Sequence, residues 1–156
     1  MTRTLALVAI VFGVCACGSD DDEPEVAVAA QVAGSYTGNE IFVVDNEESS
    51  NETKTYVFAK ATDTAVDLTI PEVGMGMMTI PSFSVKGITL STDGSTIKGK
   101  LASYEGTVKG ADGADKAFTV SNLTALFSGN MVVVTFSMKY GRMPFSFIES
   151  FTGTRK

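Results

Sequence analysis

The chain has 156 residues and a formal net charge of −6, with no His and no Trp. This length suits one domain with one ordinary core. The acidic balance, without any basic stripe, excludes nucleic acid as a partner because phosphates would repel the chain. Histidine is the commonest general base and metal ligand near neutral pH. Its absence leads us to predict a non-enzymatic protein with no catalytic residue, no cofactor and no metal.

Residues 1–16 show the pattern of a secretory signal peptide, with Arg3, an apolar run over residues 5–14 and a small-residue cleavage site. The run is about half the length of a membrane-spanning helix, which needs roughly 20 apolar residues. The residues 14–16 and the Cys17 that follows resemble a bacterial lipobox. We therefore predict that Cys17 is lipidated and anchors the protein to a membrane, since two or more acyl chains anchor stably. The alternative is an ordinary signal peptide that leaves Cys17 as a free thiol.

Residues 17–31 are predicted to be the acylated cysteine and an acidic tether. The proposed sorting tether consists of Ser19, Asp20, Asp21, Asp22 and Glu23. This stretch resembles the signal that displays Bacteroidota lipoproteins on the outer face of the outer membrane. The resemblance implies an outer-membrane lipoprotein exposed at the cell surface. The alternatives are an outer-membrane lipoprotein that faces the periplasm and a plain solvated tether, since blocks of like charge repel and stay disordered. Residues 26–32 are expected to be the end of the tether or a first strand rather than a helical turn.

From about residue 34 the sequence predicts antiparallel β-structure. Val66, Leu68 and Ile70 alternate with polar residues, which is the period-two pattern of a half-buried strand. Turn signals separate the apolar runs, at residues 93–94, 112–113, 129–130 and 141. A change of phase at residues 86–87, where the second residue is Gly, predicts a β-bulge. The run over residues 131–140 has apolar residues on both sides, so we expect it to be the most enclosed strand.

Several segments resemble calycin-like (lipocalin-like) β-barrel lipoproteins of Bacteroidota in order and spacing. They are Val32-Ala33-Gly34-Ser35-Tyr36-Thr37-Gly38, Val66-Asp67-Leu68-Thr69-Ile70, Gly74-Met75-Gly76-Met77-Met78, residues 80–88, Met143-Pro144-Phe145 and Phe151-Thr152-Gly153-Thr154. The resemblance covers residues 32–156. It implies an all-β fold, an antiparallel up-and-down barrel of about eight strands in which the first and last strands pair. It supplies no catalytic residues.

Acidic residues in the predicted strands leave catalysis by two carboxylates formally open. Glu40, Glu105 and Glu149 are the candidates, and we expect them on the solvent face or at the barrel mouth instead. The acidic stretch over residues 45–52 lacks the glycine and the ligand order of an EF-hand loop. It is therefore expected to be a mobile hairpin loop rather than a calcium site.

Three further features are candidate sites. Met75, Met77 and Met78 could form a flap or partner patch, because methionine-rich surfaces adapt to apolar partners. The favoured alternative is a bent strand pair whose methionines fill the core. Tyr140 and Arg142, at a predicted strand end, could make a polar contact beside an aromatic ring, although a solvated hairpin turn explains them as well. Thr64 lies in Asp63-Thr64-Ala65, which resembles an O-glycosylation acceptor of exported Bacteroidota proteins.

The sequence favours a lipid-anchored β-barrel that holds a small apolar or amphipathic ligand. Small barrels of about eight strands either fill with side chains or hold one small ligand. The alternative is a protein-interaction module, such as an inhibitor or an accessory subunit of an outer-membrane complex, that uses its loops.

Overall fold

The computed structural model describes residues 25–75 and 78–156. Cys17 and the sorting tether, residues 19–23, therefore lie outside the described residues, as does Met77. Among the residues described, no helix has both the length and the apolar character needed to cross a membrane.

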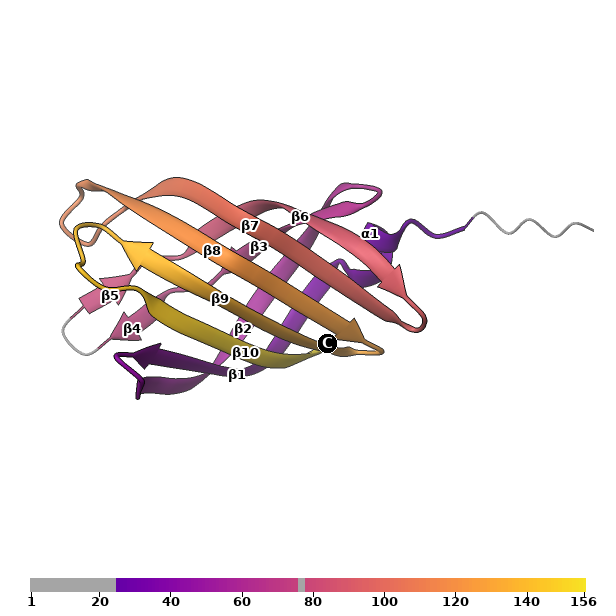
Figure 1. Ribbon diagram of the computed structural model, residues 1–156, viewed down its shortest axis with the longest axis horizontal. Helices are drawn as coiled ribbons and strands as arrows, with labels where there is room; N and C mark the ends of the chain where they lie inside the picture. The colour runs from indigo at the N-terminus through magenta and orange to yellow at the C-terminus, as the bar shows by residue number, and fades with distance from the viewer. Residues whose placement is uncertain (1–24, 76–77) are drawn as a thin grey trace, which may run out of the picture.

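Eight long strands close an antiparallel barrel in the order β1-β10-β9-β8-β7-β6-β3-β2, and a two-stranded β4-β5 hairpin lies at one end (Figure 1). The elements are α1 (Val28–Val32), β1 (Gly34–Val44), β2 (Glu47–Thr62), β3 (Ala65–Ile70), β4 (Val73–Met75), β5 (Met78–Ile80), β6 (Phe83–Asp93), β7 (Thr96–Lys109), β8 (Asp115–Ser128), β9 (Met131–Tyr140) and β10 (Phe147–Arg155). The predicted all-β fold is confirmed. β1 and β10, the first and last strands, pair and close the barrel.

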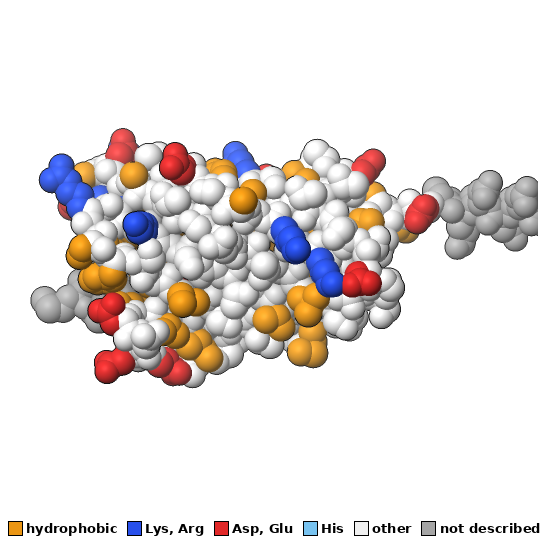
Figure 2. All heavy atoms as spheres, in the orientation of Figure 1, with side chains coloured by type: hydrophobic (Ala, Val, Ile, Leu, Met, Phe, Trp, Pro, Cys, Tyr) orange, Lys and Arg blue, Asp and Glu red, His pale blue; other side chains and the backbone are white. Residues whose placement is uncertain are grey.

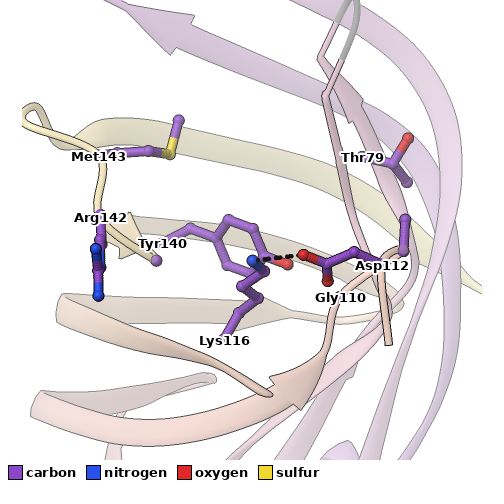
Figure 3. A pocket seen from close by; sticks show the side chains of 9 residues that line it. Thr79, Gly110, Asp112, Lys116, Tyr140, Arg142 and Met143 are labelled. Carbon is purple, nitrogen blue, oxygen red and sulfur yellow. Dashed lines mark hydrogen bonds and ion pairs between the residues drawn. The ribbon is translucent and has the colours of Figure 1, made fainter. Parts of the chain in front are cut away.

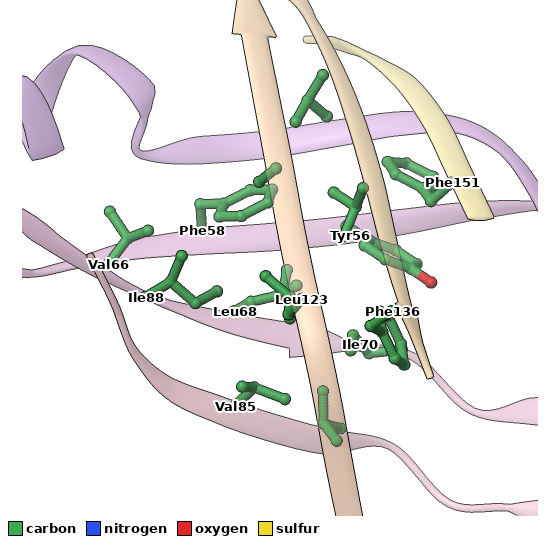
Figure 4. Packing of buried hydrophobic residues seen from close by; sticks show 14 of the residues in the cluster. Tyr56, Phe58, Val66, Leu68, Ile70, Val85, Ile88, Leu123, Phe136 and Phe151 are labelled. Carbon is green, nitrogen blue, oxygen red and sulfur yellow. The ribbon is translucent and has the colours of Figure 1, made fainter. Parts of the chain in front are cut away.

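The core is the interior of the barrel. Along each strand apolar side chains alternate inward, as in β3, where Val66, Leu68 and Ile70 are fully buried. Aromatic rings from distant strands meet inside, and the ring of Phe127 lies 5.0 Å from that of Phe58 between centroids. Figure 4 shows aromatic rings, among them those of Phe58 and Phe151, together with branched side chains between the strands. Burial of such groups is the main force that holds the barrel together.

The helix α1 closes the end of the barrel at which the chain enters (Figure 1). Ala29 and Val32 are buried there, and the Arg155 side chain donates a hydrogen bond of 2.7 Å to the hydroxyl of Tyr36. The expectation that residues 26–32 form the end of a tether or a first strand is wrong for Val28–Val32. The two buried residues, Ala29 and Val32, are three apart, which places them on one helical face.

The predicted bulge at residues 86–87 is confirmed. Val66 pairs with Ile88 and Leu68 pairs with Val85, so two residues of β6 lie opposite Asp67 alone. Gly87 has a φ of 77°, a conformation that glycine adopts easily. Its N–H donates a hydrogen bond of 3.0 Å to Asp67 Oδ1.

The outer wall is mostly polar, with apolar side chains in small groups (Figure 2). The expectation that residues 131–140 form the most enclosed strand is wrong, because Met131 is 47% exposed and Val133 is 37% exposed. Leu126 on β8 pairs with Val133 and is 44% exposed. We call Leu126, Met131 and Val133 the outer apolar patch.

Candidate functional site

The barrel end opposite α1, which we call the mouth, carries an open depression of about 510 Å³. Its walls come from the β7–β8 turn, the segment after β9 and the β5 strand (Figure 3). The lining residues are Thr79, Gly110, Ala111, Asp112, Lys116, Tyr140, Gly141, Arg142 and Met143. Tyr140 and Arg142, the pair singled out from the sequence, thus line one depression together.

The local chain path explains how Tyr140 and Arg142 come to border the same space. Tyr140 is the last residue of β9 and its side chain is buried on the inner face. Gly141 follows with a φ of 58°, which turns the chain at low steric cost. Its N–H donates a hydrogen bond of 2.7 Å to the carbonyl of Ala117 on β8. The exposed Arg142 comes next, so an aromatic ring and a guanidinium group flank one tight turn.

Some charged groups at the mouth form ion pairs within the described residues and Arg142 does not. Lys116 donates to Asp112 Oδ2 at 2.9 Å, and this hydrogen bond is the main cause that lowers the pKa of Asp112. Burial raises the pKa of Tyr140, so its hydroxyl is neutral at physiological pH. Arg142 forms no ion pair with any residue that the structure describes. The mouth therefore offers one guanidinium group without an acidic partner beside an aromatic ring and the half-buried Met143.

Of the other sequence-predicted sites, Thr64 does not line this depression, and the methionine side chains are not described. Met75 and Met78 pair across β4 and β5, but their side chains, like the whole of Met77, fall outside the described part of the chain. Thr64 is exposed in the β2–β3 turn, and its N–H donates to Thr62 Oγ1 at 3.3 Å.

The acidic stretch over residues 45–52 belongs to a β-hairpin, most of it in the strand β2. It forms a two-residue turn, Asp45 and Asn46, with φ angles of 50° and 65°, and the strand pairing resumes at Glu47. Among the described residues, no group of three or more His, Cys, Asp or Glu side chains could hold a metal ion.

Glu40 and Glu149 lie inside the barrel. Glu40 is 1% exposed and Glu149 is fully buried, whereas Glu105 is exposed as expected. The expectation of a solvent-facing or mouth position is therefore wrong for Glu40 and Glu149. The register explains the result, because Glu149 alternates with Phe147 and Phe151 on the inner face of β10.

These two carboxyl groups, which we call the buried glutamate pair, belong to the two strands that close the barrel. Phe42 pairs with Glu149 and Glu40 pairs with Phe151, so the glutamates are diagonal neighbours across β1 and β10. The hydroxyl of Tyr56 donates a hydrogen bond of 2.7 Å to Glu40 Oε2. Neither carboxyl oxygen of Glu149 accepts a hydrogen bond from any described residue.

Burial dominates the protonation of the pair. It raises the pKa of Glu149 well above its usual value, and the negative charge of Glu40 raises it further. Burial also raises the pKa of Glu40, although the neighbouring Glu149 and the charge of Lys54 oppose that shift. Neither glutamate lines the mouth depression. The pair therefore titrates inside the core, away from the mouth depression.

Comparison with protein-family models and with curated proteins gives no match. A crystal structure of a "putative outer membrane protein" from Bacteroides fragilis has a similar fold, with a TM-score of 0.64 and 20% sequence identity. The alignment covers 83% of this chain and 53% of that chain. This chain thus spans about half the length of that protein, and the likeness shows the fold alone.

Proposed function

We propose that this protein is an exported, lipid-anchored, calycin-like β-barrel that binds a small amphipathic anion at its mouth and performs no catalysis. The observation that carries the proposal is one depression lined both by Tyr140 and by Arg142, whose guanidinium group forms no ion pair with a described residue (Figure 3). Its volume of about 510 Å³ lies within the range of about 300–1,000 Å³ for small-molecule sites.

The lining combines apolar groups with a positively charged group. Tyr140 and Met143 offer an aromatic face and a thioether, both of which suit an apolar body. Arg142 offers a planar fork of donors that matches a carboxylate or phosphate. A ligand with an anionic head and a short apolar body satisfies both kinds of group at once.

The location that we propose rests on the N-terminal sequence. Lipidation of Cys17 would anchor the protein to the outer membrane, and the acidic residues 19–23 would favour display at the cell surface over a periplasm-facing position. The name of the Bacteroides fragilis neighbour supports the same membrane. Thr64, exposed in a turn, is proposed as an O-glycosylation site. Intact mass measurement of the exported protein tests both modifications, since each adds a defined mass to Cys17 or Thr64.

Ligand binding can be tested on residues 25–156, because the closed barrel and α1 make their described contacts within this range. We would titrate this fragment with a fluorescent fatty-acid analogue and with the corresponding fatty alcohol. The acid should give saturable emission that unlabelled fatty acid reverses. Arg142→Gln should weaken acid binding about tenfold or more, since a hydrogen bond to a charged group is worth about 1.5–3 kcal/mol.

The matched control is Lys100→Gln, which removes an exposed positive charge on β7 away from the mouth. It should leave acid binding unchanged, and Arg142→Gln should leave alcohol binding unchanged. A flat titration with both probes at micromolar protein contradicts the ligand proposal.

The outer apolar patch favours a second function, a protein-interaction module. Leu126, Met131 and Val133 form a contiguous exposed apolar group on β8 and β9, and such groups mark contact surfaces when they are large enough. A photo-crosslinker at position 131 should then join the protein to one partner in the outer membrane. Loss of that product in Leu126→Asp, with retention in Thr124→Asp, would support the patch.

A further inference from the structure

We propose that Glu40 and Glu149 share one buried proton that holds β1 and β10 together, so that loss of this proton opens the barrel along its closing strand pair. This inference concerns the barrel wall and is independent of the ligand proposed for the mouth.

The position of the buried glutamate pair explains why its charge would affect barrel closure. β1 and β10, the first and last strands, lie side by side, and their pairing closes the sheet into a barrel. The glutamates are diagonal neighbours across that junction. In Figure 1 the indigo β1 and the yellow β10 lie side by side along the lower edge of the barrel. A repulsion between the two side chains therefore acts directly on the strands that must stay together.

Most of the described side chains around the pair are aromatic. Phe42 and Phe147 pack together with ring centroids 4.4 Å apart, and Tyr56 stacks on Phe151 at 3.9 Å. On β9 the residue paired with Glu149 is Phe136, which is also buried. The environment of the pair is thus aromatic on three sides, where an unpaired charge is costly.

The polar and charged groups facing the pair all come from β2. Tyr56 donates its single hydroxyl proton to Glu40. Within the described residues, Lys54 is the one cation that acts on both glutamates. Its ammonium group is already engaged with Glu52 Oε2 at 2.7 Å and with the carbonyl of Glu72 at 2.9 Å. Glu52 adds a further negative charge that disfavours ionisation of Glu40.

A proton on Glu149 resolves the hydrogen bonding of the pair. As a carboxylate, Glu149 would keep two buried oxygens without a donor from any described residue, which strongly destabilises an ion. As a carboxylic acid, it becomes a donor, and the carboxylate of Glu40 is the acceptor beside it. Glu40 then accepts from both Tyr56 and Glu149. Two facing carboxyl groups that hold one proton are a known consequence of like charges being forced together.

Opening must therefore release a proton. In the closed barrel Glu149 holds the proton, whereas in an opened wall it is hydrated and ionises near its ordinary pKa. Each pH unit between those two values raises the opening constant about tenfold, since one proton is released per opening. The β7–β8 hairpin carries no such pair, so its local opening lacks this dependence.

Hydrogen–deuterium exchange measured by mass spectrometry tests the inference. We would follow peptides from β1, β10 and the β7–β8 hairpin over a pH series, each corrected for the intrinsic pH dependence of amide exchange. In the wild type, exchange in β1 and β10 should rise about tenfold per pH unit above the corrected rate, while β7–β8 stays flat. Glu149→Gln should abolish the rise, because the amide keeps the shape and the donor but cannot ionise. Glu105→Gln, at an exposed glutamate, should keep it.

Infrared spectroscopy supplies a second readout that does not depend on any variant folding. The wild-type protein at neutral pH should show the carbonyl stretch of one neutral carboxylic acid, shielded from exchange with deuterated water. Absence of this band overturns the proposal. So does a pH-dependent rise in β1 and β10 that persists in Glu149→Gln, or one that β7–β8 shares equally.

Discussion

Of the described glycines, Gly38 leaves the least room for a Cβ atom, and replacing it tests how closely β1 and β10 must approach. A Cβ atom on this residue would lie 2.7 Å from the carbonyl carbon of Thr152, and closer still to the carbonyl oxygen of Thr152 and to the Cα of Gly153. All three are backbone atoms, so no side-chain rotation can relieve the overlap. Gly38→Ala therefore forces the two strands apart.

The size of the effect follows from what this separation breaks. Gly38 pairs with Gly153 in the closing ladder, and each ladder hydrogen bond contributes about 1 kcal/mol net. Overpacking of a dense interior costs about 1–3 kcal/mol more. We expect Gly38→Ala to lower the free energy of unfolding by about 3–5 kcal/mol, measured by urea denaturation followed by circular dichroism.

The matched control is Gly74→Ala in β4, where an added Cβ would lie more than 4 Å from every described atom considered. This variant should unfold within about 0.5 kcal/mol of the wild type. If Gly38→Ala is also within about 1 kcal/mol of the wild type, the closing strands are not held as tightly as the ladder implies, and the reasoning is refuted.

Two further predictions concern the buried glutamate pair. Burial raises the pKa of Glu149 above its unfolded value. Its contribution to stability is therefore complete below the unfolded pKa and is lost as pH rises through the folded pKa. Between these two pKa values the free energy of unfolding should fall by about 1.4 kcal/mol per pH unit. Urea denaturation at several pH values measures this slope, and a slope unchanged in Glu149→Gln contradicts it. Tyr56→Phe removes the donor to Glu40 and should lower the free energy of unfolding by about 1.5–3 kcal/mol at neutral pH. The same substitution is then made in a Glu40→Gln background. If it lowers the free energy of unfolding there by the same amount, the hydrogen bond contributes nothing.

The strands were accessible from sequence because each carries its own local signal. Val66, Leu68 and Ile70 alternate with polar residues and are buried as that pattern predicts. The phase change at residues 86–87 located a bulge, because a one-residue insertion inverts the alternation on either side of it. The helix α1 was missed because five residues are too few to establish a 3.6-residue period.

The mouth was only partly predictable. Tyr140 and Arg142 flank a glycine turn, which is a local feature, and both line the depression. Lys116 and Asp112, which determine the charge beside them, come from β8 and from the turn before it. Their position depends on the pairing of β8 with β9, and that register is fixed by long-range contacts that a single sequence does not display.

For Glu149 the alternation along β10 predicted burial, whereas the general expectation for a glutamate predicted exposure. The alternation along β10 places Glu149 on the same face as Phe147 and Phe151, which is the interior. The opposite expectation assumed that a glutamate is ionised and must therefore reach water. That assumption fails when a second carboxyl group can accept the proton's hydrogen bond, and Glu40 supplies this group from the other end of the chain. The closing of the barrel thus brings the two glutamates together, and the proton that they share removes the charge that would push them apart.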